Sequence, residues 1–329
     1  MTWFRRLDVS LSKSFSNWLS GHGRIYWRRF SGPVFIILAI VVTLVIFFID
    51  GQQILNYTFQ LNPALVLLSV VIEFSGLILA VPAWHLILAR FGSRLSYQDD
   101  LRIYCYTILG IVIPGGVWSL VGRVALYERQ GVPGMYVTVA TVVEFMLIGL
   151  AGLAVYGLTI FIQPAETIWQ RPGIALLVMA MTLILVQPPV FNRIATLILS
   201  RSNPINAPLT LLSYKDLGVL LGLEILTLII GGTAIYVLLQ SFVIAPASLY
   251  ITMVRAWAAG AVVSNLLFWL PGKPVLRDGA IIVVLAQTLP VSLAVGFVII
   301  LRAWTIMSVL LAAGLAWLFL RRKPYLPTE

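Results

Sequence analysis

Long apolar runs, separated by short polar segments, dominate this chain. A helix needs about 20 mainly apolar residues to cross the hydrocarbon core of a membrane. Six runs approach or exceed that length: Pro33–Ile49, Ala64–Ala89, Val137–Ile162, Gly173–Val190, Leu217–Leu239 and Val295–Leu320. The pattern therefore predicts an all-α, polytopic membrane bundle with about six spanning helices.

Two further apolar runs, at 103–121 and 251–289, are interrupted by proline and glycine. The interruptions are Pro114-Gly115-Gly116 and Pro271-Gly272-Lys273-Pro274. Proline removes a helical hydrogen bond, and glycine loosens the backbone. Such breaks occur within a membrane only where protein or a water-filled cavity satisfies the freed polar groups. We therefore predict that each broken run forms a helical hairpin.

The distribution of basic residues predicts that both hairpins are re-entrant, so that each enters and leaves the membrane on one face. Most lysines and arginines lie in the N-terminal segment, in the loops at 90–102, 122–136 and 191–216, and in the C-terminal tail. Cytoplasmic loops carry the excess of Lys and Arg. These segments share one side only if the broken runs turn back. Both termini are then cytoplasmic, in a protein of the cell inner membrane.

Composition supports a membrane protein and limits the other classes. Hydrophobic residues make up 60% of the chain and charged residues 10%, whereas a soluble domain carries about 25% charged residues. The net charge of +10 follows from the basic cytoplasmic loops, so nucleic acid is not an expected partner. Cys105 is the only cysteine, which excludes an intrachain disulfide.

The order of elements suggests an internal repeat, because span, span, hairpin, span occurs twice. Glu73 and Glu224 lie in corresponding spans, and Arg123 and Arg277 follow the corresponding breaks. Each half has three crossings, so the halves are inverted relative to each other. Inverted repeats with broken helices point to a transport site near the membrane midplane. The alternative is a coincidence between two apolar stretches.

The predicted organisation has four parts. Residues 1–32 form a basic N-terminal segment, which is either an amphipathic helix on the inner membrane surface or an unstructured tail. Residues 33–162 and 163–320 form the two membrane repeats, and 321–329 form a cytoplasmic tail.

Charged residues within or beside apolar runs are the candidates for function, because a charge at the bilayer centre costs about 2.5–3.5 kcal/mol on insertion scales. Six of them are Glu73, Glu144, Glu224, Arg123, Arg277 and Asp278. They either line a polar path or form structural ion pairs. Arg255 and Arg302 lie near the outer ends of their runs, where the expected role is snorkelling to the interface.

The tips of the hairpins are predicted to bind an anion. A half-helix is expected to restart after each break, and free N–H groups at such starts attract anions. Arg123, Lys273 and Arg277 add positive charge nearby, so a phosphate-bearing lipid headgroup is the expected ligand. Trp118 either stacks on the headgroup or acyl chain or packs against the wall of the bundle.

Signatures of catalysis are sparse. Only His22 and His85 are present, and no His/Cys spacing suits a metal. Asp99-Asp100, followed by Arg102, fits a solvated loop better than a metal-bound phosphate site. The sequence therefore predicts no enzymatic activity, no cofactor and no metal.

Short motifs at the breaks resemble the transmembrane region of lysylphosphatidylglycerol synthases and their stand-alone relatives. The motifs are Ile113-Pro114-Gly115-Gly116-Val117-Trp118, Gly122-Arg123-Val124, Glu144, Leu270-Pro271-Gly272 and Arg277-Asp278-Gly279. The resemblance covers roughly residues 33–320 and implies a flippase-like module with two re-entrant hairpins. The full synthases continue into an aminoacyl-transferase domain, whereas a stand-alone member without that activity is expected here.

One motif departs from the family. The second break reads Lys273-Pro274-Val275-Leu276-Arg277-Asp278, where relatives usually have more glycine and an Arg-Glu pair. The resemblance therefore does not predict which headgroup binds. The predicted function is translocation of a membrane lipid or a polyprenyl-linked saccharide, with an anionic headgroup bound at the hairpins. Two alternatives stay open: an integral-membrane enzyme acting on a lipid phosphate, and a non-catalytic partner of an envelope glycosyltransferase. Envelope-biosynthesis enzymes are candidate partners.

Overall fold

The computed structural model describes residues 61–111, 118–163, 172–193, 212–267 and 273–319. Within these ranges the chain is helical and contains no strand. The predicted span Pro33–Ile49, the segment 1–32 and the tail 321–329 lie outside the described residues, as do Pro114-Gly115-Gly116 of the first break and Pro271-Gly272 of the second.

Five helices in the described residues are long and apolar enough to cross a membrane. They are α2 (Pro63–Arg90), α5 (Gly134–Ile162), α8 (Tyr214–Gln240), α9 (Leu249–Leu266) and α11 (Val291–Phe319). Four of them coincide with predicted spans, and α9 coincides with the first arm of the second predicted hairpin. Large apolar side chains such as Leu67 and Leu310 are exposed on these helices, as contact with lipid requires. The prediction of an all-helical membrane bundle is therefore confirmed.

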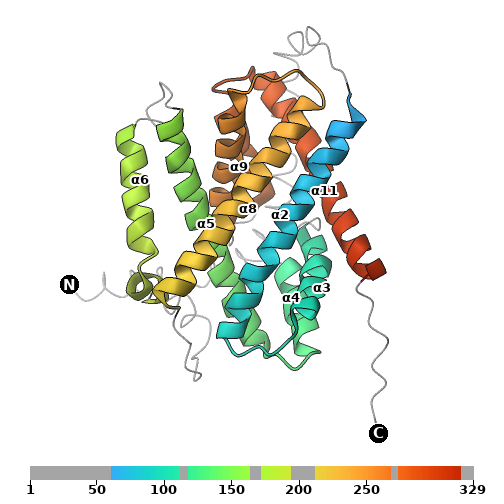
Figure 1. Ribbon diagram of the computed structural model, residues 1–329, viewed down its shortest axis with the longest axis vertical. Coiled ribbons are helices and arrows are strands. Elements are labelled where there is room, and N and C mark those ends of the chain that lie inside the picture. The colour runs from blue at the N-terminus through green and yellow to red at the C-terminus, as the bar shows by residue number, and fades with distance from the viewer. Residues whose placement is uncertain (1–60, 112–117, 164–171, 194–211, 268–272, 320–329) are drawn as a thin grey trace, which may run out of the picture.

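The predicted span Gly173–Val190 is shorter in the structure. Helix α6 covers Pro172–Leu185, which is 14 residues or about 21 Å at the usual helical rise. The chain turns at 186–187, directly before Pro188. A residue that precedes proline is disfavoured in the helical region, which accounts for the early end of α6. The helix packs against α5 at the edge of the bundle (Figure 1).

Capping residues fix where the apolar helices begin. At the start of α8, the Ser213 hydroxyl accepts from the backbone N–H of Asp216, and the Asp216 carboxylate accepts from the backbone N–H of Ser213. This reciprocal pair is a capping box. Asp216 also accepts a hydrogen bond from Arg90 at 2.5 Å. The contact places the end of α2 beside the start of α8, so the two helices are antiparallel (Figure 1).

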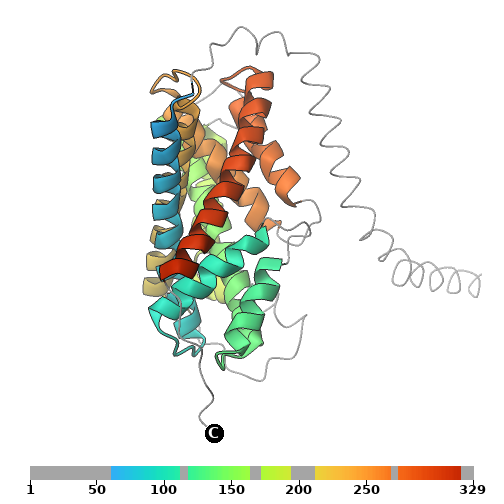
Figure 2. The same cartoon turned by 90° about the vertical axis from the view of Figure 1, so that its right-hand side faces the viewer.

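The first broken run folds as two short helices in contact. Helix α3 (Tyr97–Thr107), continued by the 3₁₀ turn η1 (Ile108–Ile111), packs against α4 (Trp118–Glu128). At the tip, a Cβ on Gly110 would lie 2.3 Å from the backbone N of Ser119, so only glycine permits this approach. The chain enters α3 and leaves α4 at the end of the bundle where α8 begins (Figures 1 and 2).

The second broken run also folds as two helices in contact, in the opposite half of the bundle (Figure 2). Helix α9 packs against α10 (Lys273–Leu285). Helix α9 has 18 residues and α10 has 13, so α9 alone of this pair has the length of a spanning helix.

Small residues bring α8 and α9 close together. A Cβ on Gly232 would lie 2.7 Å from the Cα of Val254, and a Cβ on Gly231 would lie 2.2 Å from the indole nitrogen of Trp257. Membrane helices use small residues at such interfaces, because their backbones then approach closely enough for dense packing. This packing fixes Trp257 beside α10.

Candidate functional site

Arg123 on α4 and Glu144 on α5 form an ion pair inside the bundle. The two residues expose only 7% and 2% of their surface. The guanidinium also lies over two aromatic rings, 4.2 Å from the centroid of Trp84 and 4.5 Å from that of Tyr104. Its buried Nε makes no hydrogen bond to the described residues. Glu144 and two aromatic rings thus fix the position of the Arg123 guanidinium, while its Nε–H has no acceptor among the described residues.

A second buried carboxylate lies near this pair. Glu224 on α8 exposes 3% of its surface, and its charge interacts with those of both Glu144 and Arg123. The Thr227 hydroxyl donates to the Glu224 carboxylate at 3.4 Å. Glu144 and Glu224 therefore both interact electrostatically with Arg123.

The start of α10 adds two more cations to this region. The Lys273 ammonium lies 4.8 Å from the ring centroid of Phe145, the residue next to Glu144. The Arg277 guanidinium lies 4.6 Å from the ring centroid of Trp257. Both geometries suit a cation–π contact. Neither cation takes part in any of the five ion pairs of the described residues.

Electrostatic interactions join these groups into one site. The charge of Lys273 interacts with those of Arg277, Glu144 and Arg123. Arg277 in turn interacts with Glu73 on α2. We call the six residues the central charged cluster: Arg123, Lys273, Arg277, Glu73, Glu144 and Glu224. The two arginines that follow the separate breaks are thus connected through Lys273.

The remaining predicted site residues are Asp278, Trp118 and the residues of the two breaks. Asp278 interacts electrostatically with Arg277, and it accepts hydrogen bonds from Arg302, from Nε at 2.9 Å and from Nη2 at 2.6 Å. Trp118 is 48% exposed. The hairpin-break residues lie outside the described ranges: Pro114, Gly115, Gly116, Pro271 and Gly272.

The snorkelling role expected for Arg255 is wrong. Arg255 exposes 3% of its surface. Its Nη2 donates to the backbone oxygens of Thr159 at 2.7 Å and Gln163 at 2.5 Å. The last carbonyls of a helix lack partners within the helix, and Arg255 satisfies two of them at the end of α5.

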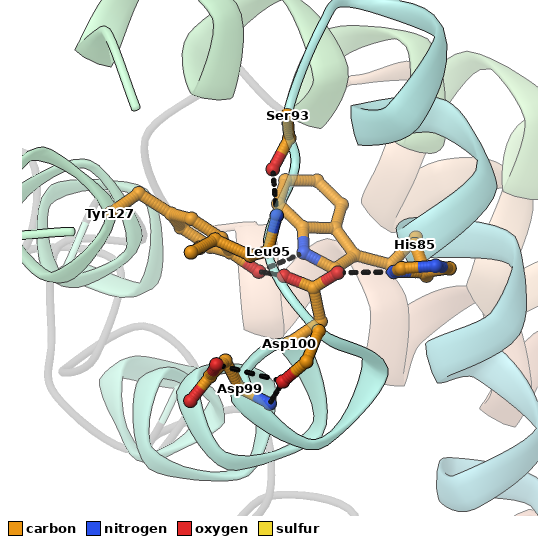
Figure 3. A network of polar contacts seen from close by, with 8 residues as sticks. His85, Ser93, Leu95, Asp99, Asp100 and Tyr127 are labelled. Atoms are coloured by element: carbon orange, nitrogen blue, oxygen red, sulfur yellow. Dashed lines mark hydrogen bonds and ion pairs between the residues drawn. The ribbon is translucent and has the colours of Figure 1, made fainter. Parts of the chain in front are cut away.

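The solvated loop expected at Asp99-Asp100 is also wrong, because these residues expose 4% and 1% of their surface in the first turn of α3. Asp100 accepts a hydrogen bond from the Tyr127 hydroxyl and contacts His85, as Figure 3 shows. Sequence reasoning missed Trp84, Tyr104 and Tyr127 beside the charged residues. One available signal was that Tyr127 follows Arg123 by four positions, a spacing that places both on one helical face.

No group of three or more potential metal-ligating side chains occurs in the part of the chain that the structure describes. Comparisons with models of protein families, with curated proteins and with solved structures found no match. Evidence for function therefore comes from the residues and geometry of the central charged cluster.

Proposed function

We propose that the protein translocates a lipid, or a lipid-linked saccharide, whose anionic headgroup binds at the central charged cluster. The observation that carries this proposal is that Arg123 and Lys273, from the helices after the two breaks, contact the adjacent residues Glu144 and Phe145 of α5. Arg277 lies one helical turn after Lys273 in α10. Like charges repel strongly where the dielectric constant is low. The carboxyl groups of the cluster offset part of that repulsion, and a phosphate group offers further oxygen acceptors to all three cations.

The contacts of the three cations leave capacity for such a ligand. The Nε of Arg123 is buried without a partner among the described residues, and an unsatisfied buried donor costs about 1–3 kcal/mol. Lys273 and Arg277 rest on aromatic rings rather than in ion pairs. The planar guanidinium binds phosphate oxygens in two places and stays charged. A phosphate-bearing headgroup supplies oxygen acceptors for the Arg123 Nε–H and for the charged groups of Lys273 and Arg277.

The arrangement of aromatic residues supports two inverted halves with re-entrant hairpins. In each helix pair, a ring on the first helix lies beneath the arginine of the second: Tyr104 beneath Arg123, and Trp257 beneath Arg277. Inverted halves deliver matching groups to a shared site from opposite sides. The resemblance to the lysylphosphatidylglycerol synthase transmembrane region agrees with this arrangement. On this proposal the protein lies in the inner membrane with both termini in the cytoplasm.

Native mass spectrometry of lipids that co-purify with the full chain tests headgroup binding. Wild-type protein should retain anionic lipids, and Arg277→Gln should lose them without loss of folding, because Arg277 has no ion pair to break. Arg90→Gln is the matched control, since it removes an exposed arginine that pairs with Asp216, outside the central charged cluster. Identical lipid profiles in all three proteins contradict the proposal.

Reconstitution into liposomes then tests movement between leaflets. Fluorescent phosphatidylglycerol in one leaflet should cross faster with wild type than with Arg277→Gln. Chemical conversion of a lipid phosphate in detergent micelles, without two compartments, would instead support the enzyme alternative.

A further inference from the structure

A second polar network lies beside the central charged cluster and ends on a partly exposed histidine (Figure 3). Trp84 Nε1 donates to the Tyr127 hydroxyl at 2.7 Å, and that hydroxyl donates to Asp100 Oδ1 at 2.7 Å. Asp100 Oδ2 lies 2.5 Å from His85 Nδ1. The first three residues expose at most 1% of their surface, whereas the His85 side chain is 32% exposed. The network thus leads from the surface to the interior.

The chemistry of the donors fixes most proton positions in this network. An indole N–H can only donate, so the Tyr127 hydroxyl accepts from Trp84 and directs its single proton to Asp100 Oδ1. That oxygen is therefore an acceptor. The remaining proton of the Asp100–His85 contact lies between Oδ2 and Nδ1. The pair can gain or lose one proton at the imidazole while every other hydrogen bond of the network persists.

The inner end of the network meets the central charged cluster. The Arg123 guanidinium lies over the ring of Trp84. The Tyr127 hydroxyl interacts electrostatically with both Asp100 and Arg123. The hydrogen-bonded side chains of Tyr127 and Trp84 therefore connect Asp100 to the ring over which Arg123 lies.

Few other charged groups face the pair. Helix α3 contributes Asp99, which acts on Asp100 and is held by Ser96 and Arg102. It also contributes Tyr97, whose ring lies edge-on to His85 at 5.8 Å. Burial raises the pKa of the Asp100 carboxyl above its usual range, and hydrogen bonds from His85 and Tyr127 partly oppose that increase.

The charged groups on the other neighbouring helices have partners of their own. These pairs are Arg90 of α2 with Asp216 of α8, Glu144 of α5 with Arg123 of α4, and Arg302 of α11 with Asp278 of α10. Glu224 of α8 interacts electrostatically with Glu144 and Arg123. His85 and Asp100 contact each other rather than any of these charged groups.

We propose that His85 and Asp100 form a proton-binding site that controls how strongly the central charged cluster binds an anionic headgroup. This inference rests on the proposed function. When the imidazole is neutral, the pair carries one negative charge. This charge weakens the attraction between Arg123 and an anionic headgroup. One added proton, with no electron transfer, brings the pair to zero charge. Proton uptake therefore strengthens headgroup binding, and by thermodynamic linkage headgroup binding strengthens proton uptake.

The sign of the pH dependence follows from this scheme. Affinity for an anionic lipid should therefore be high at pH 5.5 and fall as the pH rises to 8. Coupling of this kind typically changes affinity by about 5-fold or more.

Binding of short-chain phosphatidylglycerol to the purified full chain, measured at pH 5.5 and 8, tests the inference. Asp100→Asn keeps an acceptor for Tyr127 and removes the negative charge, so it should bind more tightly than wild type at pH 8. His85→Asn keeps a donor near the Nδ1 position and cannot take up a proton, so it should bind more weakly than wild type at pH 5.5. Arg90→Gln, which breaks an exposed ion pair, is the control that should keep the wild-type pH profile.

The outcomes separate this inference from the proposed function. Wild-type binding that is independent of pH overturns the proton site and leaves the headgroup site intact. Weaker binding in both Asp100→Asn and His85→Asn at both pH values shows a merely structural network and also overturns it. Absence of phosphatidylglycerol binding at either pH counts against the proposed function itself, and the inference falls with it.

Discussion

The buried Arg123–Glu144 pair allows a double-mutant cycle that separates folding from function. Removing one member of a buried ion pair costs about 3–5 kcal/mol, because the other charge is left without a partner. The two single variants should not be equal. Arg123→Gln leaves Glu144 facing a second carboxylate, Glu224, whereas in Glu144→Gln the arginine still interacts with Glu224. The loss of stability in Arg123→Gln should therefore be at the upper end of that range. The loss in Glu144→Gln should be at or below its lower end.

The double variant Arg123→Gln/Glu144→Gln removes both charges from the pair. Neither side chain of the double variant is left as an uncompensated buried charge, so we expect its loss of stability to be about 0.5–3 kcal/mol smaller than the sum of the two single losses. Thermal unfolding in a neutral detergent gives the stability, and phosphatidylglycerol binding by the same proteins gives the function. The double variant should fold and fail to bind. Additive losses of stability would show that the pair is not coupled, and a folded double variant with full binding would refute the role of Arg123.

Two further predictions concern packing and topology. Gly232→Ala should destabilise the protein by about 1–3 kcal/mol, because its Cβ would overlap the backbone of α9, whereas Gly222→Ala, with nothing within 4 Å, should stabilise it by about 0.5–1 kcal/mol; equal thermal midpoints for the two would contradict the close approach of α8 and α9. In a Cys105→Ala background, cysteines at the exposed positions Gln130 and Ile244 should react with a membrane-impermeant maleimide from opposite sides, Gln130 from the cytoplasm. Reaction of both from one side would contradict the topology.

The spans could be predicted from the sequence because lipid imposes length and apolarity regardless of which helices are neighbours. The runs Ala64–Ala89 and Leu217–Leu239 lie inside α2 and α8 for this reason. The length of an apolar run does not predict the length of the helix where a proline ends it early, as Pro188 does after α6. Run length also does not distinguish a short spanning helix from one arm of a hairpin, because α9 has 18 residues and fits both.

The residues of the candidate site could be selected from the sequence, but their partners could not. Charges within apolar runs stand out because they are expensive in a membrane, which selects Arg123, Glu144 and Lys273. Which charges meet depends on the rotation of each helix about its axis and on contacts between distant segments. Asp100 shows the same limit, because it follows a polar loop and is buried only by the packing of α2 and α4 around it.

Charge balance connects the proposed headgroup site to the proposed proton site. The central charged cluster contains three basic side chains and three carboxyl groups, those of Glu73, Glu144 and Glu224. A phosphate headgroup that binds there adds negative charge to a region of low dielectric constant, where an uncompensated charge is unfavourable. Either a carboxylate must move away toward water or a proton must bind along with the lipid. Glu144 and Glu224 are almost completely buried, so the first route requires helices to move. The second requires only a group close to the cluster that can take up a proton, and the partly exposed His85 lies one aromatic layer from Arg123. Proton-coupled binding is therefore the route that leaves the packing of the described helices unchanged.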